Sequence, residues 1–137
     1  MPSLLLDTCA AIWITENEEL SHEAIRAMDD AYRAGSAVFV SPITAWERGL
    51  LSAKGRLRSP VQPLAWFERL VRDAQLSIAA LTPSMLVDSW FLPDTFHNDP
   101  ADRILIATAR ALDLILVTRD RPILEYADKG HVRAIAC

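Results

Sequence analysis

The strongest constraint on the fold is the stretch from Phe96 to Asp120, which reads FHNDPADRILIATARALDLILVTRD. Asp99 and Pro100 are the usual pair of a helix N-cap and a first helical residue, which places Asp102 in the first turn. The helix that follows is apolar around most of its circumference, so most of it must be buried. Residues 114–117 then form a short apolar run typical of a strand covered on both faces of a parallel sheet.

Three acids mark the two ends of this stretch: Asp99 and Asp102 where the helix begins, and Asp120 just past the strand. In open α/β sheets ligands bind outside the carboxyl ends of the strands, which is where Asp120 is expected to lie. Each acid also has a structural explanation. Asp99 can cap the helix, Asp102 can complement the helix dipole, and Asp120 can occupy a turn. A role in function therefore depends on other acids reaching the same edge.

Asp7 is a further acid at the end of an expected strand. Residues 3–6 form a short apolar strand, and the segment TCAAIWIT after Asp7 predicts a helix. Asp7 can be the N-cap of that helix or a ligand at the edge of the sheet. The local sequence leaves both roles open.

Glu47 is the least expected residue of the helix that Ser41 opens. Its inward positions by helical spacing are Ile43, Trp46 or Glu47, Leu50 and Leu51, so a carboxylate lies on or beside a stripe that should be apolar. Such a carboxylate is rarely buried unless it is paired or holds a metal. The structural alternative is an ion pair with Arg48, but adjacent residues of a helix do not face each other. We therefore expect Glu47 to belong to a site.

Strands alternate with helices along the whole chain. The expected strands cover residues 3–6, 37–40, 77–81, 114–117 and 131–136. Ile25, Met28 and Tyr32 are expected on the inward stripe of the helix after Ser21. This alternation predicts one α/β domain spanning residues 1–137, with a mostly parallel sheet of five strands.

Composition and charge exclude several classes of protein. The apolar content is 51%, and no apolar run approaches the roughly 18 residues of a membrane span. The amino terminus lacks the basic region of a signal peptide, so we expect a cytoplasmic protein. Cys9 and Cys137 lack the spacing of a zinc site, and free thiols are expected. A net charge of -4 argues against broad attraction to nucleic acid, although local charge can differ.

A few basic residues are candidates for contacting a substrate. Lys54, Arg56 and Arg58 form the one basic cluster, which is by itself weak evidence for phosphate binding. Arg103 adjoins the acids and is a further candidate. His97 can assist a metal or a substrate, or fix its own loop through a backbone hydrogen bond.

The chemistry follows if Asp7, Glu47, Asp102 and Asp120 meet at one edge of the sheet. Carboxylates that close repel one another and need a cation, and oxygen ligands favour Mg²⁺ or Mn²⁺ over zinc. Such a site suits hydrolysis of a phosphodiester bond by metal-activated water. The sequence contains neither a nucleophilic-serine motif nor a glycine-rich phosphate loop.

The order of these motifs resembles the PIN domain family, and in particular the VapC-type toxins of bacterial toxin–antitoxin pairs. The matching segments are LLLD, then SPITAWE, HNDPADRILIATA and LVTRD, spread over nearly the whole chain. The resemblance implies a three-layer α/β/α sandwich and a Mg²⁺- or Mn²⁺-dependent endoribonuclease that cleaves RNA. It also implies frequent homodimers and inhibition by a cognate antitoxin whose tail enters the active site.

The resemblance also assigns residues to the site. The four acids of the family fall on Asp7, Glu47, Asp102 and Asp120, and Asp7, Asp102 and Asp120 are the expected metal ligands. Thr118 and Asp99 are expected to support them, with Asp99 either capping its helix or reaching the metal through water. Lys54, Arg56, Arg58 and Arg103 are the candidates for binding the substrate.

Other classes of function remain to be compared with this one. A flap-type or other DNA nuclease shares the fold and the ions, but would need a larger chain to grip duplex DNA. A phosphate-accepting receiver domain needs an acidic residue at the end of the central strand, whereas residues 80–82 at the end of the third strand are Ala, Leu and Thr. A non-catalytic interaction domain offers no reason for Glu47 on an inward face.

Overall fold

The computed structural model describes residues 3–56 and 61–137. Its elements follow in the order β1 (Leu4–Leu6), α1 (Thr8–Thr15), α2 (His22–Arg33), β2 (Val38–Val40), α3 (Pro42–Ala53), α4 (Pro63–Asp73), β3 (Ser77–Ile78), α5 (Pro83–Asp88), α6 (Pro100–Leu112), β4 (Ile115–Thr118), α7 (Arg121–Asp128) and β5 (Arg133–Ala136). The five strands form one sheet in the order β3-β2-β1-β4-β5, and every pairing is parallel. The predicted α/β class and parallel sheet are confirmed.

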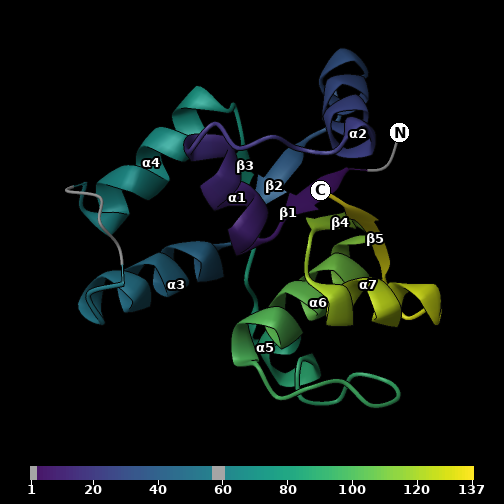
Figure 1. Ribbon diagram of the computed structural model, residues 1–137. Helices are drawn as coiled ribbons and strands as arrows, with labels where there is room; N and C mark the ends of the chain where they lie inside the picture. Colours follow the sequence, from purple (N-terminus) through teal and green to yellow (C-terminus); the bar gives the residue numbers. More distant parts are fainter. Residues whose placement is uncertain (1–2, 57–60) are drawn as a thin grey trace.

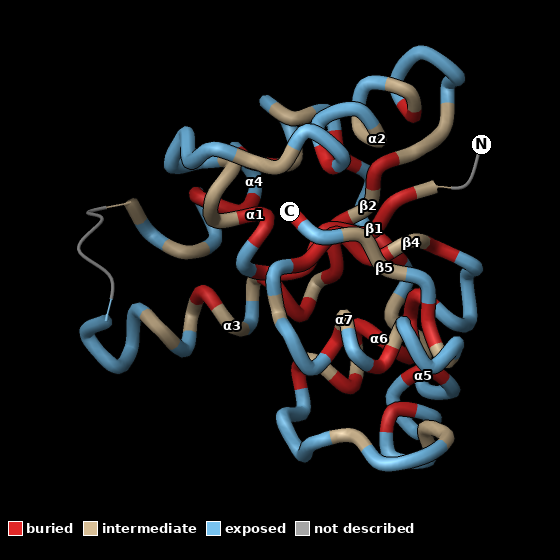
Figure 2. The backbone as a smooth tube through the Cα atoms, turned by 45° about the vertical axis from the view of Figure 1, so that its right-hand side comes forward, coloured by how far each residue is buried: buried red, intermediate tan, exposed pale blue. Residues whose placement is uncertain are grey.

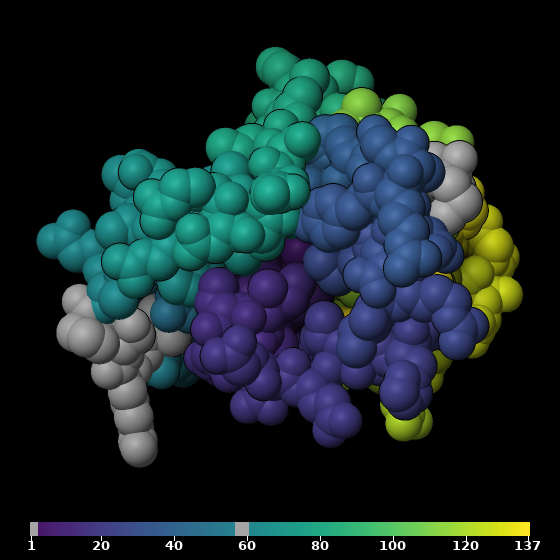
Figure 3. Space-filling model, turned by 90° about the horizontal axis from the view of Figure 1, so that it is seen from above, coloured from purple at the N-terminus to yellow at the C-terminus, as the bar shows by residue number. Residues whose placement is uncertain are grey.

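Helices cover both faces of the sheet, which gives three layers (Figure 1). Alternate residues of β1 point to opposite faces: Leu4 and Leu6 pack with α1, α2 and α4, whereas Leu5 packs with α6 and α7. The buried residues concentrate on the central strands and on α6 (Figure 2). Seen from above, the first face is covered by segments from the first half of the chain (Figure 3). This sandwich is the architecture that the family resemblance predicts.

The topology decides where the carboxyl ends of the strands lie. β1 is central, and its neighbours are β2 on one side and β4 on the other. Leu6 is in register with Val40 and with Val117, so the three strands end at nearly the same level. Asp7, Ser41 and Thr118 therefore emerge along one edge of the sheet.

Three predicted details were wrong near the edge of the sheet and on α2. The third strand is only Ser77–Ile78, because it is an edge strand with both residues exposed. The central strand is β1, which ends at Asp7, so the argument against a receiver domain from the third strand does not hold. On α2 the buried residues are Ala24 and Ala31, while Ile25 and Tyr32 are exposed. The small side chains let the helix approach the sheet closely.

The predicted inward stripe of α3 is correct at Ile43 and at Glu47, the alternative to Trp46, but wrong at Leu50. Trp46 and Leu50 are exposed, and the buried positions are Ile43, Thr44 and Arg48. α3 extends away from the sheet and packs mainly against α4, so its other side faces solvent (Figure 1). Among the described residues, none of the helices has the length and apolar character needed to span a membrane.

Candidate functional site

Asp7 joins the first strand to the first helix at the centre of the edge. One oxygen, Oδ1, accepts the backbone N–H of Ala10 at 2.7 Å and so caps α1, while Oδ2 accepts the hydroxyl of Thr118 at 2.5 Å. The backbone N–H of Asp7 donates to the carbonyl of Val117 at 3.1 Å. Asp7 is only 4% exposed, and it ties β1 to β4. The cap and the site position, which the sequence left as alternatives, are both present.

The other aspartates also lie at helix N-termini. Asp99 caps α6 by accepting the backbone N–H of Asp102 at 3.0 Å, and Asp120 caps α7 by accepting the N–H of Ile123 at 3.1 Å. The N–H of Asp120 in turn donates to the hydroxyl of Thr118 at 2.9 Å. Helix N-termini stabilise negative charge, which partly offsets the crowding of carboxylates at this edge.

Glu47 reaches the edge from the first half of α3. Its Oε1 accepts the hydroxyl of Thr8, the residue after Asp7, and that hydroxyl also lies 3.0 Å from the hydroxyl of Thr44. The alternative pairing with Arg48 is absent, because the Arg48 guanidinium lies over the Trp66 ring at 4.4 Å. Glu47 is therefore held at the site by a hydroxyl, with no arginine neutralising it among its described contacts.

The carboxylates act on one another electrostatically. Burial, together with the charge of Asp120, raises the pKa of Asp7 to about 6 against the hydrogen bonds that lower it. Burial, then Asp99, Asp120, Glu47 and Asp7, raise the pKa of Asp102 to about 7. Burial also raises the pKa of Glu47, with Asp99 and Asp7 contributing. These shifts show that the acids of four distant segments converge and repel.

Cys9, which is exposed beside the site, is also close enough to the four acids to be affected by their charge. Burial raises the pKa of its thiol to about 12, and Asp7, Glu47, Asp102 and Asp120 each add to the rise. A thiol with a raised pKa stays protonated and is a poor nucleophile. Both cysteines are free, as predicted.

A divalent cation fits this set of donors. One ligand atom each from His97, Asp102 and Asp120 lie within 4.8 Å of one another. Asp102 and Asp120 belong to the expected ligand set, whereas His97 was not in that set and Asp7 is not in this group. Oxygen donors with uncompensated negative charge are the ligands of Mg²⁺ and Mn²⁺. A bound cation would relieve the repulsion that raises the carboxyl pKa values.

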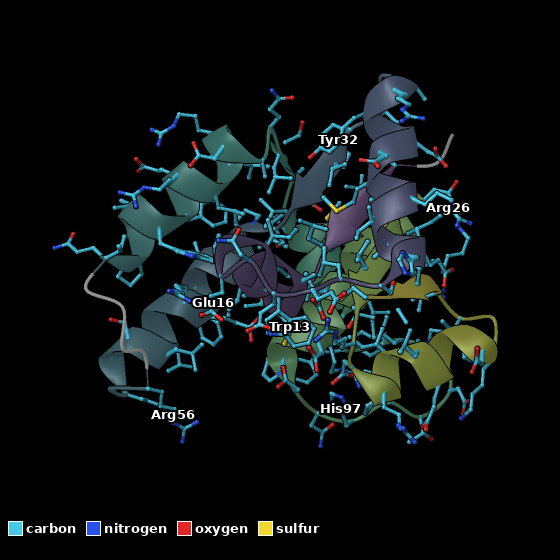
Figure 4. All side chains as sticks on the ribbon, turned by 45° about the horizontal axis from the view of Figure 1, so that its top comes forward. Trp13, Glu16, Arg26, Tyr32, Arg56 and His97 are labelled. Carbon is cyan, nitrogen blue, oxygen red and sulfur yellow. The ribbon has the colours of Figure 1, made fainter. Side chains whose placement is uncertain are left out.

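The described basic residues that were predicted to bind substrate differ in their placement. Arg103 is only 8% exposed, and its guanidinium donates to the carbonyls of Ser89, Phe96 and His97. It fixes the loop before α6, which does not fit the predicted role in binding substrate. Lys54 is exposed at the end of α3, and Arg56 points into solvent away from His97 (Figure 4). Arg58 lies outside the described residues.

Sequence reasoning missed two features of the site. Thr8 and Thr44 hold Glu47, and the only signals were that Thr8 follows Asp7 and that Thr44 lies one helical turn before Glu47. His97 was left undecided, because its place depends on how the loop before α6 folds back onto the helix.

The comparisons with known proteins agree with this geometry. The family model described as PIN domain matches residues 4–129. Ribonuclease VapC22 from Mycobacterium tuberculosis is 32% identical over 127 residues, covering 92% of this chain and 93% of that protein.

Two solved structures are similar in fold. The crystal structure of VapBC2 from Rickettsia felis, bound to a DNA fragment from their promoter, matches with a TM-score of 0.71 at 13% identity over 98% of both chains. FitAcB from Neisseria gonorrhoeae matches with a TM-score of 0.58 at 20% identity over 96% of both chains. The family resemblance of the sequence is confirmed: the chain belongs to the PIN domain family, and its relatives there include VapC-type proteins.

Proposed function

We propose that this protein is an Mg²⁺- or Mn²⁺-dependent endoribonuclease of the VapC type. The observation that carries the proposal is the convergence of Asp7, Glu47, Asp102 and Asp120 at one edge of the sheet, where burial and the neighbouring carboxylates raise the pKa values of Asp7, Glu47 and Asp102. The relative named Ribonuclease VapC22 supports RNA as the substrate. A carboxylate cluster without a nucleophilic serine motif favours hydrolysis by water.

Each residue of the site has a separate proposed role. Asp102 and Asp120, with Asp7 beside them, would hold the divalent ions. Bound ions supply a Lewis acid and a water of lowered pKa at the scissile phosphate. Thr118 orients the Asp7 carboxylate through its hydroxyl. Glu47 keeps one carboxylate oxygen on Thr8 and has the other available to accept a proton from water, which its raised pKa favours.

RNA cleavage by the purified protein should require a divalent ion. We expect cleavage of single-stranded RNA with Mg²⁺ or Mn²⁺ and none with excess EDTA, measured on gels with end-labelled substrates. Sequencing of the cleaved ends would identify the preferred site. Equal cleavage with and without EDTA would refute the metal-dependent mechanism. Faster cleavage of DNA than of RNA would instead favour a DNA nuclease of the same fold.

We also propose that an antitoxin protein inhibits this site in the cytoplasm. The similarity in fold to the VapBC2 structure supports this, because that structure is of a VapBC assembly. A pocket of about 490 Å³ between α1, α3 and α4, which none of the four site acids lines, offers a separate place where a partner segment could dock. Within the described residues, the buried Nε and Nη1 of Arg48 beside it have no hydrogen-bond partner. In the RNA assay, adding the product of a neighbouring small gene should stop cleavage.

We further propose a homodimer formed through α5 and the turn after it. Leu86, Val87, Trp90 and Phe91 are all exposed there, and Phe91 is 79% exposed. A contiguous exposed apolar patch of this kind marks an interaction surface.

The dimer should depend on Phe91. A Phe91→Glu variant places a charge in the proposed interface, and we expect it to run as a monomer in size-exclusion chromatography with light scattering, while the unmodified protein runs as a dimer. Leu64→Glu is the matched control, because Leu64 is exposed on α4, outside the patch. A wild-type monomer, or equal dissociation by both variants, would exclude this interface.

A further inference from the structure

His97 lies on a loop whose backbone is fixed on both sides of the residue. The Nη1 group of Arg103 donates to the carbonyl of Phe96 at 2.9 Å and to the carbonyl of His97 at 3.1 Å. Its Nε donates to the carbonyl of Ser89 at 2.7 Å. Because Arg103 follows Asp102 directly on α6, the same turn of helix that presents Asp102 also anchors the backbone of His97.

The imidazole ring of His97 is fixed as well. It packs on the Phe96 ring, with the two ring centroids 4.1 Å apart. Its Nδ1 accepts the backbone N–H of Asp99 at 3.2 Å. A nitrogen that accepts a hydrogen bond carries no proton, so the neutral ring must carry its hydrogen on Nε2. The backbone of the α6 N-cap thus selects one tautomer.

The selected Nε2–H group faces the acidic site. Nε2 lies 3.5 Å from Oδ2 of Asp102, and the side chains of the two residues are 37% and 23% exposed. At this distance an N–H group is attracted electrostatically to a carboxylate oxygen. If His97 were instead to bind a metal through Nε2, the ring would need its hydrogen on Nδ1. Nδ1–H and the backbone N–H of Asp99 would then both be donors facing each other, and the hydrogen bond between them would be lost.

We propose that His97 is a positioning residue that orients the Asp102 carboxylate through Nε2–H and is not itself a ligand of the metal. This inference rests on the proposed metal-dependent function. In many metal sites a carboxylate orients a histidine that binds the metal. Here the roles are exchanged, and a histidine orients the carboxylate. If His97 attracts one oxygen of Asp102, as the 3.5 Å approach of Nε2 to Oδ2 allows, the other oxygen is free to face the ion. Loss of such supporting contacts typically weakens metal binding roughly 10- to 100-fold.

Two substitutions separate the functions of the two ring nitrogens. His97→Gln keeps an amide N–H group near the position of Nε2, whereas His97→Asn keeps only a polar atom near the position of Nδ1. We expect His97→Asn and His97→Ala to weaken Mn²⁺ binding at least about tenfold in isothermal titration calorimetry, and His97→Gln to stay close to the wild-type affinity. His22→Ala is the matched control, because His22 is exposed on α2.

Spectroscopy tests the inference without relying on activity. In the metal-free protein at mildly alkaline pH, long-range ¹H–¹⁵N spectra should show the hydrogen of His97 on Nε2. With Mn²⁺ bound, pulsed electron paramagnetic resonance should show no directly coordinated imidazole nitrogen. A hydrogen on Nδ1, a coordinated nitrogen, or equal Mn²⁺ affinity of all the His97 variants would overturn the inference. If the wild-type protein neither bound Mn²⁺ nor cleaved RNA, the proposed function itself would fail.

Discussion

Replacing Asp102 by asparagine is expected to abolish RNA cleavage while raising the melting temperature of the metal-free protein. The activity should fall at least about a hundredfold, because even residues that only orient metal ligands contribute roughly 10- to 100-fold. The stability should rise because asparagine has a similar shape but no charge to desolvate by burial or to repel the neighbouring carboxylates. Each kcal/mol of repulsion removed should add roughly 4 °C in a domain of this size.

This prediction is checked by thermal melts in EDTA together with the gel assay. Asp29→Asn is the matched control, since Asp29 is exposed on α2 and should change neither quantity. Asp102 is a better choice than Asp7, because the Asp7 carboxylate also caps α1 and binds Thr118. Retained cleavage would show that Asp102 is not needed for the reaction. A lower melting temperature in the variant would show that the charge of Asp102 does not destabilise the fold.

The advantage of the Asp102→Asn variant in stability should disappear as the pH falls. The pKa of Asp102 is about 7 in the folded protein and near 3.8 in the unfolded chain, so acidification adds a proton to the folded state first. Proton uptake by the folded state stabilises it, and the destabilising charge is fully present only above about pH 7. Asp7, with a folded-state pKa of about 6, titrates in both proteins, so acidification should stabilise both through this group.

Protons should weaken the stabilisation by Mn²⁺, because both compete for the same carboxylates. We expect Mn²⁺ to raise the melting temperature of the wild-type protein strongly at about pH 8 and little at about pH 5. Melts with Mn²⁺ or EDTA at several pH values would measure both trends. A stabilisation by Mn²⁺ that did not change with pH would place the ion elsewhere.

The sequence predicted the positions of Asp7 and Asp120 because each stands between a strand and a helix, and those of Asp99 and Asp102 because Pro100 marks the start of a helix. Asp7 follows an apolar strand, and Asp99 precedes a proline, so their places as caps were evident from local rules. Convergence then followed from parallel pairing, since adjacent parallel strands present their carboxyl ends to one edge. Local signals and topology agreed for these residues.

Local rules failed where packing between distant segments decides the outcome. Helical spacing placed Leu50 inward and left Trp46 and Glu47 as alternatives, but Leu50 and Trp46 are exposed and Arg48 is buried instead. Arg103 was expected to contact substrate, but three carbonyls of a loop that precedes it in the chain surround its guanidinium. His97 depends on that same loop. No periodicity of the sequence encodes contacts of this kind.

The central position of β1 has a consequence for the synthesis of this protein. The first strand to leave the ribosome acquires its second neighbour only when β4 emerges, more than a hundred residues later. Asp102 and Asp120 belong to that late part of the chain, and domains generally fold as units. A nascent chain that ends before α6 therefore holds only Asp7 and Glu47 of the four acids, so the cluster is complete only once β4 and Asp120 have emerged.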